Sequence, residues 1–203
     1  MTSKLPAPLL SRKFFGRRMS LILALAALNI GIGAVVSVLK LPIYLDSIGI
    51  VIAAMVLGLL PAVLCAAITC AVGFFLINPY LPAYFGTSVV IALLATVCRR
   101  ANLFRSLPLA VLSGLIIAVG AALASAPITA ILFGGTTLSG ADAITAFFVS
   151  SGHALLESVF YAGLMSEPID KVLVCLVAFG VLRSLPRSFY NRNGIRYYRH
   201  ERT

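Results

Sequence analysis

Three clusters of basic residues, separated by long apolar stretches, constrain the fold of this chain more than any other feature. Fourteen of the sixteen Lys and Arg residues lie in the segments 4–18, 99–105 and 183–202. Positive charge is retained in the cytoplasm when a membrane protein inserts, so all three segments are expected on the cytoplasmic side. The chain is therefore predicted to cross the membrane an even number of times, with both termini in the cytoplasm.

The composition indicates an integral membrane protein. The chain has 203 residues, of which 61% are hydrophobic and 11% charged, and its mean hydropathy is +1.05. These values lie far outside the range of water-soluble domains. We predict one membrane domain at 19–186, with basic cytoplasmic segments at 1–18 and 187–203. The net charge of +10 does not indicate nucleic-acid binding, because the basic residues lie at the ends of apolar segments.

The apolar runs predict an all-α bundle of six transmembrane helices. The first run, 19–39, is too long for a signal peptide and is expected to be retained as a helix. The run 47–77 is longer than one crossing needs, and Gly58 and Pro61 interrupt it, which favours two short crossings at 46–60 and 61–77. Two more helices are expected at 84–98 and 107–133, the second with a kink at Pro127.

The last third of the chain contains two apolar segments, 143–165 and 172–185, although the basic C-terminal segment allows only one net crossing. We expect an additional helix within 134–167 that lies at the outer surface or dips into the membrane. The last crossing is then expected at 170–185. A seventh crossing would place the last basic cluster outside, which the charge rule disfavours. The four cysteines lack paired or metal-ligand spacing and are predicted to be buried apolar residues.

Polar side chains gather on the predicted outer side, after the first helix and at the turn after the third. As a set they are candidates for a substrate site, and the residues are Tyr44, Asp46, Asn78, Tyr80, Tyr84 and Thr87. Simpler interpretations stay open. Asp46 and Ser47 are at positions that cap a helix, and tyrosines commonly anchor a helix at the membrane interface.

A second candidate group is spaced at three or four residues, which predicts one stripe on a helix: Ser150, His153, Glu157 and Tyr161. Ionisable groups in an apolar run are costly unless they face a polar cavity or each other. The stripe is therefore a candidate to line a substrate pocket or relay protons, and the structural alternative is a simple His153–Glu157 pair. Too few ligands are present for a metal site.

No catalytic constellation and no nucleotide-binding loop is found, so we expect neither enzymatic activity nor a cofactor. Small residues on the first helix, Ala27 with Gly31 and Gly33 with Ser37, lie one turn apart and allow another helix to approach closely. That helix belongs either to a partner protein or to the same bundle.

Several of these features together resemble the substrate-binding S components of energy-coupling factor (ECF) transporters, particularly the riboflavin-transporter-like group. They are the segment LPIYLDSIG at 41–49, the break at Gly58, the turn at Asn78 and Pro79, and the pair Asp170 and Lys171. The resemblance implies a six-helix bundle in the prokaryotic cell membrane with an outer pocket for a vitamin or related small molecule. It implies that the pocket is shaped by Tyr44 and Asp46 and by segments 78–88 and 142–161.

The resemblance also implies partners. Small residues of the first helix form the docking face for a transmembrane coupling subunit driven by ATPases, and Ala27, Gly31, Gly33 and Ser37 match that character. Two other functions stay open: an ion-coupled secondary carrier with His153 and Glu157 as a proton relay, and a membrane sensory domain. The short tail after Arg183 disfavours the sensory domain, and dependence on ATPases separates the importer from the carrier.

Overall fold

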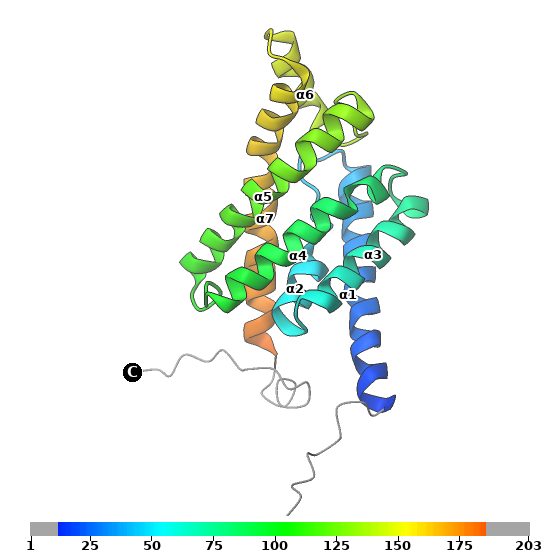
Figure 1. Ribbon diagram of the computed structural model, residues 1–203, viewed down its shortest axis with the longest axis vertical. Helices are drawn as coiled ribbons and strands as arrows, with labels where there is room; N and C mark the ends of the chain where they lie inside the picture. The colour runs from blue at the N-terminus through cyan, green and yellow to red at the C-terminus, as the bar shows by residue number, and fades with distance from the viewer. Residues whose placement is uncertain (1–11, 186–203) are drawn as a thin grey trace, which may run out of the picture.

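The computed structural model describes residues 12–185, and all regular structure in this range is helical (Figure 1). The predicted all-α fold is confirmed, whereas segments 1–11 and 186–203 lie outside the described residues. In chain order the elements are α1 (Arg12–Val38), α2 (Ile48–Val56), α3 (Leu59–Leu76), the 3₁₀ helix η1 (Leu81–Tyr84), α4 (Phe85–Arg100), α5 (Leu107–Phe133), α6 (Asp142–Ser150) and α7 (Leu155–Ser184).

Four helical stretches are long and apolar enough to cross a membrane. They are Gly16–Val38, Leu59–Leu76, Leu81–Arg100 and Leu107–Phe133. Large apolar side chains on their surfaces are exposed, including Phe75, Leu76 and Ile131. Exposed apolar surface of this kind on such helices indicates a membrane protein, because the lipid bilayer shields those side chains from water.

Helix α2 is shorter than the predicted second crossing. It has nine residues and is therefore about 14 Å long, whereas a hydrocarbon core is about 30 Å thick. All nine residues are buried, and α2 contacts α1, α3, α4 and α7. The predicted break is confirmed at Gly58, which has a φ of 99° and is the N-cap residue of α3. Only Leu57 and Gly58 lie between the end of α2 and the start of α3. Helix α2 is thus the central element of the bundle.

The predicted last helix at 170–185 is wrong in its starting point. Helix α7 runs without interruption for 30 residues and contains Pro168. Within 134–167 only α6 is a separate helix, and residues 155–167 already belong to α7. The expected additional helix is therefore present, and its position at the outer surface or within the membrane stays a prediction. Helix α5 packs along α7, and their backbones approach closely at Gly114, where a Cβ atom would lie 2.7 Å from Cα of Val172. The ionisable residues expected at the start of a helix therefore lie in the middle of one.

The path of the chain places the two ends of the described range at the same end of the bundle (Figure 1). In Figure 1 the start of α1 and the end of α7 both lie at the bottom of the view, and α6 lies at the top. The segment 39–47, which joins α1 to α2, lies away from those ends (Figure 1). The non-helical connections that matter for the candidate site are therefore separated from the two ends by much of the length of the bundle.

A buried amide joins the first three helices. Asn29 is fully buried on α1; its Oδ1 accepts a 2.6 Å hydrogen bond from the Gly49 N–H, and its Nδ2 donates to Thr69 Oγ1 at 3.2 Å. Helices α1 and α2 are so close at this point that a Cβ atom on Gly49 would lie 2.1 Å from the carbonyl oxygen of Leu25. Glycine is required at position 49 because no side-chain atom fits.

The close contact of α1 with α2 predicts that Gly49→Ala destabilises the protein by about 3 kcal/mol, since the backbone of one helix must move. Gly31→Ala is the matched control, because nothing lies within 4 Å of its added Cβ atom. All four cysteines are buried, so a thiol-reactive fluorogenic dye reports thermal unfolding in detergent. Equal midpoints for the two variants would contradict the close approach.

Candidate functional site

A cavity opens between α1, the segment 39–47, η1, α4, α5, the segment 134–141 and α7. Its volume is about 130 Å³, counted as the space open to the centres of water molecules. That space accommodates a compact ligand of roughly ten to twenty non-hydrogen atoms. All members of the first predicted group line it, namely Tyr44, Asp46, Asn78, Tyr80, Tyr84 and Thr87. The structure therefore brings together polar residues that the sequence places at two separate turns.

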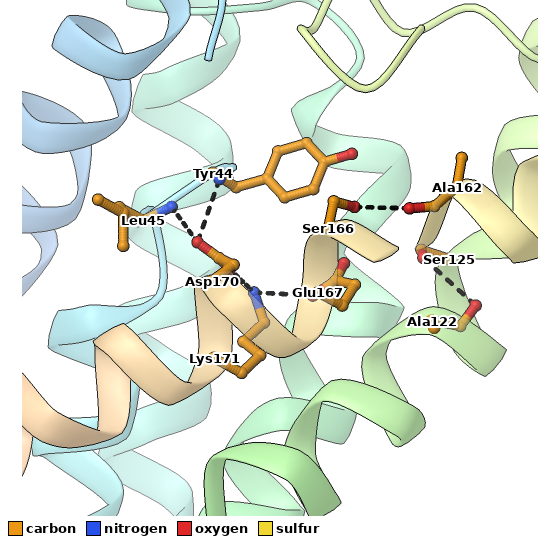
Figure 2. A network of polar contacts seen from close by, with 9 residues as sticks. All are labelled: Tyr44, Leu45, Ala122, Ser125, Ala162, Ser166, Glu167, Asp170 and Lys171. Carbon is orange, nitrogen blue, oxygen red and sulfur yellow. Dashed lines mark hydrogen bonds and ion pairs between the residues drawn. The ribbon is translucent and has the colours of Figure 1, made fainter. Parts of the chain in front are cut away.

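Three ionisable side chains of α7 form the charged floor of this region (Figure 2). Glu167 and Lys171 line the cavity, while Asp170 lies behind it and is fully buried. The Lys171 ammonium forms an ion pair with Asp170 and a second one, 3.1 Å long, with Oε2 of Glu167. Charged groups at this depth are costly unless they are paired or serve a function.

Asp170 also holds the non-helical backbone between α1 and α2. Its Oδ1 atom accepts hydrogen bonds from the N–H groups of Tyr44, at 3.1 Å, and Leu45, at 2.7 Å (Figure 2). Leu45 has a φ of 49°, a left-handed conformation that such side chains rarely adopt. Without an acceptor, these buried N–H groups would cost several kcal/mol in an apolar surrounding. The carboxylate thus fixes the segment that carries Tyr44 and Asp46.

Asp46 does not act as the predicted helix cap. Ser47 occupies the N-cap position of α2 without a side-chain hydrogen bond to the helix, and its hydroxyl has no partner within the described residues. Asp46 instead is half-buried in the cavity wall and interacts electrostatically with Lys171 and Asp170. Three carboxylates and one ammonium therefore share a small volume.

Hydrogen bonds tie the segment 134–141 over the cavity. Asn78 Nδ2 donates to the Thr137 carbonyl at 2.7 Å, and Lys40 Nζ donates to the Leu138 carbonyl at 3.0 Å. At Gly140 a Cβ atom would lie 2.3 Å from the Lys40 carbonyl oxygen, so this segment rests directly on the backbone that follows α1. These contacts assign Asn78 a structural role in addition to lining the cavity.

Aromatic rings form another part of the wall. Tyr80 stacks on Phe133 with ring centroids 4.3 Å apart, and the Tyr84 hydroxyl hydrogen bonds to Thr129 at 2.7 Å. Both tyrosines line the cavity rather than serving only as interfacial anchors. A wall that combines rings, hydroxyls and charges fits recognition of a small polar molecule with a flat portion.

The second predicted group does not line the cavity, and its single helical stripe is wrong. None of the four is among the residues that line the cavity. Ser150 is the last residue of α6, His153 lies in the turn between α6 and α7, and Glu157 and Tyr161 lie on α7, so the four do not share one helix. His153 contacts the rings of Phe148 and Tyr161, with centroids 5.8 and 5.5 Å away. No His153–Glu157 ion pair forms among the described residues.

The small residues of α1 divide into two pairs with different surroundings. Gly33 and Ser37 line the cavity, and a Cβ atom on Gly33 would lie 3.3 Å from the Asp46 side chain. Ala27 and Gly31 are exposed on the outside of the bundle. Only the second pair is accessible to another protein.

Sequence reasoning missed Glu167 and Lys171 as cavity residues. Their four-residue spacing within a long apolar region was a usable signal, because it places both on one helix face with Asp170 beside them. A last helix that begins at Asp170, as the sequence analysis predicts, leaves Glu167 outside the helix and hides this spacing. Within residues 12–185 no three His, Cys, Asp or Glu side chains are arranged to hold a metal ion.

The role of Asp170 predicts a large stability effect. Asp170→Asn removes the charge that balances Lys171, and we expect it to lower the free energy of unfolding by about 3 kcal/mol. Glu157→Gln, an exposed change on the same helix, is expected to leave the unfolding midpoint unchanged. Both are measured by dye labelling of the buried cysteines, and a wild-type midpoint for Asp170→Asn would exclude a structural role for its charge.

Asp46 should behave in the opposite way. Its carboxylate adds negative charge to a region that already holds Glu167 and Asp170. We therefore expect Asp46→Asn to raise the unfolding midpoint of the ligand-free protein at pH 7.5, because it removes like-charge repulsion and the cost of burying a charge. A lower midpoint would mean that Asp46 stabilises the fold rather than the bound state.

Comparisons with known proteins do not assign the chain to a family. No family model matches the chain, and neither a curated protein nor a solved structure matches it. The function is therefore argued from the cavity and from the side chains that surround it.

Proposed function

We propose that this protein is the substrate-capture subunit, or S component, of an ECF-type importer. It binds a vitamin or related small molecule in the cavity and delivers it together with a transmembrane coupling subunit and ATPase subunits. The observation that carries the proposal is a cavity with a charged floor, Glu167 and Lys171, inside an apolar helical bundle. Ionisable residues in such a bundle commonly mark the site of a transported substrate.

The interrupted chain between α1 and α2 supports a substrate site in the same place. Irregular backbone at membrane depth is tolerated only where it is buried in protein or lines a cavity. The segment 39–47 meets the second condition, because Tyr44 and Asp46 line the cavity, and Asp170 accepts the N–H groups of Tyr44 and Leu45.

The proposed topology has six crossings, with both termini in the cytoplasm of a prokaryotic cell. The segment 39–47 and the short α2 together make the second crossing, and α7 makes the last. With 30 residues α7 is about 45 Å long, so it exceeds the roughly 30 Å hydrocarbon core. Its first turns and α6 then stand at the outer face, and the cavity opens on that side.

Docking on a coupling subunit is assigned to Ala27 and Gly31. Both are exposed on a helix that crosses the membrane, and no atom lies within 4 Å of a Cβ built on Gly31. Small residues at such positions allow close helix–helix packing in lipid. Gly33 and Ser37 are not part of the proposed docking face, because they line the cavity.

The stand-alone carrier receives less support. Its expected proton relay, His153 and Glu157, lies outside the cavity and does not form a pair. No specific contact among the described residues favours a sensory domain. The importer is therefore the function that we put to the test.

The test is native mass spectrometry of the protein purified gently from its own host, which reads bound small molecules and associated subunits together. We expect a small-molecule ligand and an ATPase-linked coupling subunit. Ala27→Leu and Gly31→Leu should abolish the association with that subunit, because the added side chain blocks close helix packing, while ligand binding stays intact.

Gly180→Leu is the matched control, since Gly180 is also exposed on a long helix with no atom within 4 Å of an added Cβ. This control should retain the coupling subunit. A protein that carries no ligand and no partner, and that transports alone in vesicles, would contradict the importer.

A further inference from the structure

We propose that the cavity selects an organic molecule bearing a positively charged nitrogen group, an ammonium or amidinium, which is held between the carboxylates of Glu167 and Asp46. The inference rests on the proposed function only in that a small molecule enters this cavity. It names the charge class of that molecule, which neither the helical architecture nor the resemblance to S components specifies.

The residues around Lys171 carry an excess of negative charge. Asp46 and Glu167 are the carboxylates among the described lining residues, Asp170 pairs with Lys171 behind the wall, and Lys171 is the one cation among the described lining residues. The formal charge of the group is therefore −2 when all four are ionised. Lys40, in the segment 39–47, is exposed and donates to the Leu138 carbonyl instead. An excess of negative charge in a low-dielectric region favours a cation.

Two of the three carboxylates are positioned to contact a ligand in the cavity. Asp170 is satisfied, because it accepts two backbone N–H groups and pairs with Lys171. It lies behind the wall and is fully buried. Glu167 and Asp46 line the cavity itself. Lys171 is shared between Asp170 and Glu167, so one positive charge faces three carboxylates. A cationic ligand between Glu167 and Asp46 compensates the surplus negative charge.

An unpartnered polar group in the cavity wall is evidence of a ligand that does not depend on charge. Glu167 is only 5% exposed, and its Oε2 atom is partnered by Lys171 at 3.1 Å. The hydroxyl of Thr87 is 7% exposed, lines the same cavity and has no partner within the described residues. Buried polar atoms are nearly always hydrogen bonded, so unpartnered ones in a cavity wall mark contacts made by a ligand.

The remaining wall restricts the body of the ligand. Tyr44, Tyr80 and Tyr84 line the cavity, and a cation near the face of such a ring gains further stabilisation. A bare metal ion does not fit this description, because no metal-binding set occurs within residues 12–185 and the cavity is much larger than an ion. An organic cation with a flat, ring-sized body matches both the charge and the walls.

The test compares three probes of nearly equal size and different charge: benzamidine, which is cationic, benzamide, which is neutral, and benzoate, which is anionic. Their binding to the detergent-purified protein is measured by ligand-observed NMR titration at pH 7.5. We expect saturable binding of benzamidine that is at least about tenfold tighter than that of either other probe, a difference of about 1.4 kcal/mol. Preference for benzoate or benzamide, or no saturable binding of benzamidine, would overturn the cation site.

Variants locate the binding. Glu167→Gln and Asp46→Asn should each weaken benzamidine binding about tenfold, whereas Glu157→Gln, which removes an exposed carboxylate outside the cavity, should leave it unchanged. Asp46→Asn is informative even if Glu167→Gln misfolds, because we expect it to raise the stability of the ligand-free protein. Loss of binding with a gain in stability separates ligand contact from a structural role. Unchanged benzamidine affinity in Asp46→Asn would overturn the site.

The two proposals fail in different ways. A coupling-subunit complex that carries a neutral or anionic small molecule in native mass spectrometry would refute the cation site and leave the importer standing. Selective benzamidine binding without any partner would leave the cation site and refute the importer.

Discussion

The hydrogen bonds from the backbone of Tyr44 and Leu45 to Asp170 are the constraint on which the rest of the site depends. A chain that leaves the helical conformation inside an apolar bundle exposes N–H groups that no helix satisfies. Asp170 accepts two of them. Its own charge is then balanced by Lys171, which lies one residue further along α7. A buried ion pair on the last helix thereby allows the first two helices to be joined by irregular backbone.

The irregular segment forms one wall of the cavity. Its residues Leu41, Ile43, Tyr44 and Asp46 are among those that line it. Helix α2 begins only at Ile48 and is completely buried. It belongs to the packed core of the bundle, whereas the segment before it borders the cavity. Gly49 makes this possible by letting α2 lie directly against the backbone of α1. Gly49, which the packing of α2 requires, thus lies only a few residues after Tyr44 and Asp46, which line the cavity.

Not every charge in this region serves the fold. Asp170 and Lys171 form a structural pair, whereas Asp46 and Glu167 add negative charge beyond what Lys171 balances. Buried negative charge in excess of the available cations lowers stability, and proteins retain it mainly at functional sites. The opposite stability effects expected for Asp170 and Asp46 follow from this division of roles.

Much of the helical framework was accessible from the sequence. The bounds of α5, the break at Gly58 and the polar residues at the two turns follow from local hydropathy and from the conformations that glycine and proline prefer. The stripe from Ser150 to Tyr161 failed because helical spacing was extended through a turn that contains Gly152, whose φ is 91°. The start of α7 was missed because this helix continues through Pro168, supported by its long contact with α5.

The sequence by itself therefore determined that this chain is helical and belongs in a membrane, because hydropathy and helix length are properties of consecutive residues. It also determined which polar residues are unusual in such a chain. Only the tertiary structure decided which of them meet. The bond from Leu45 to Asp170 joins residues 125 positions apart, and no local pattern reveals that pairing. The cavity and its charged floor are products of long-range packing among α1, α2, α5 and α7, which is why they emerge from the fold and not from any single segment.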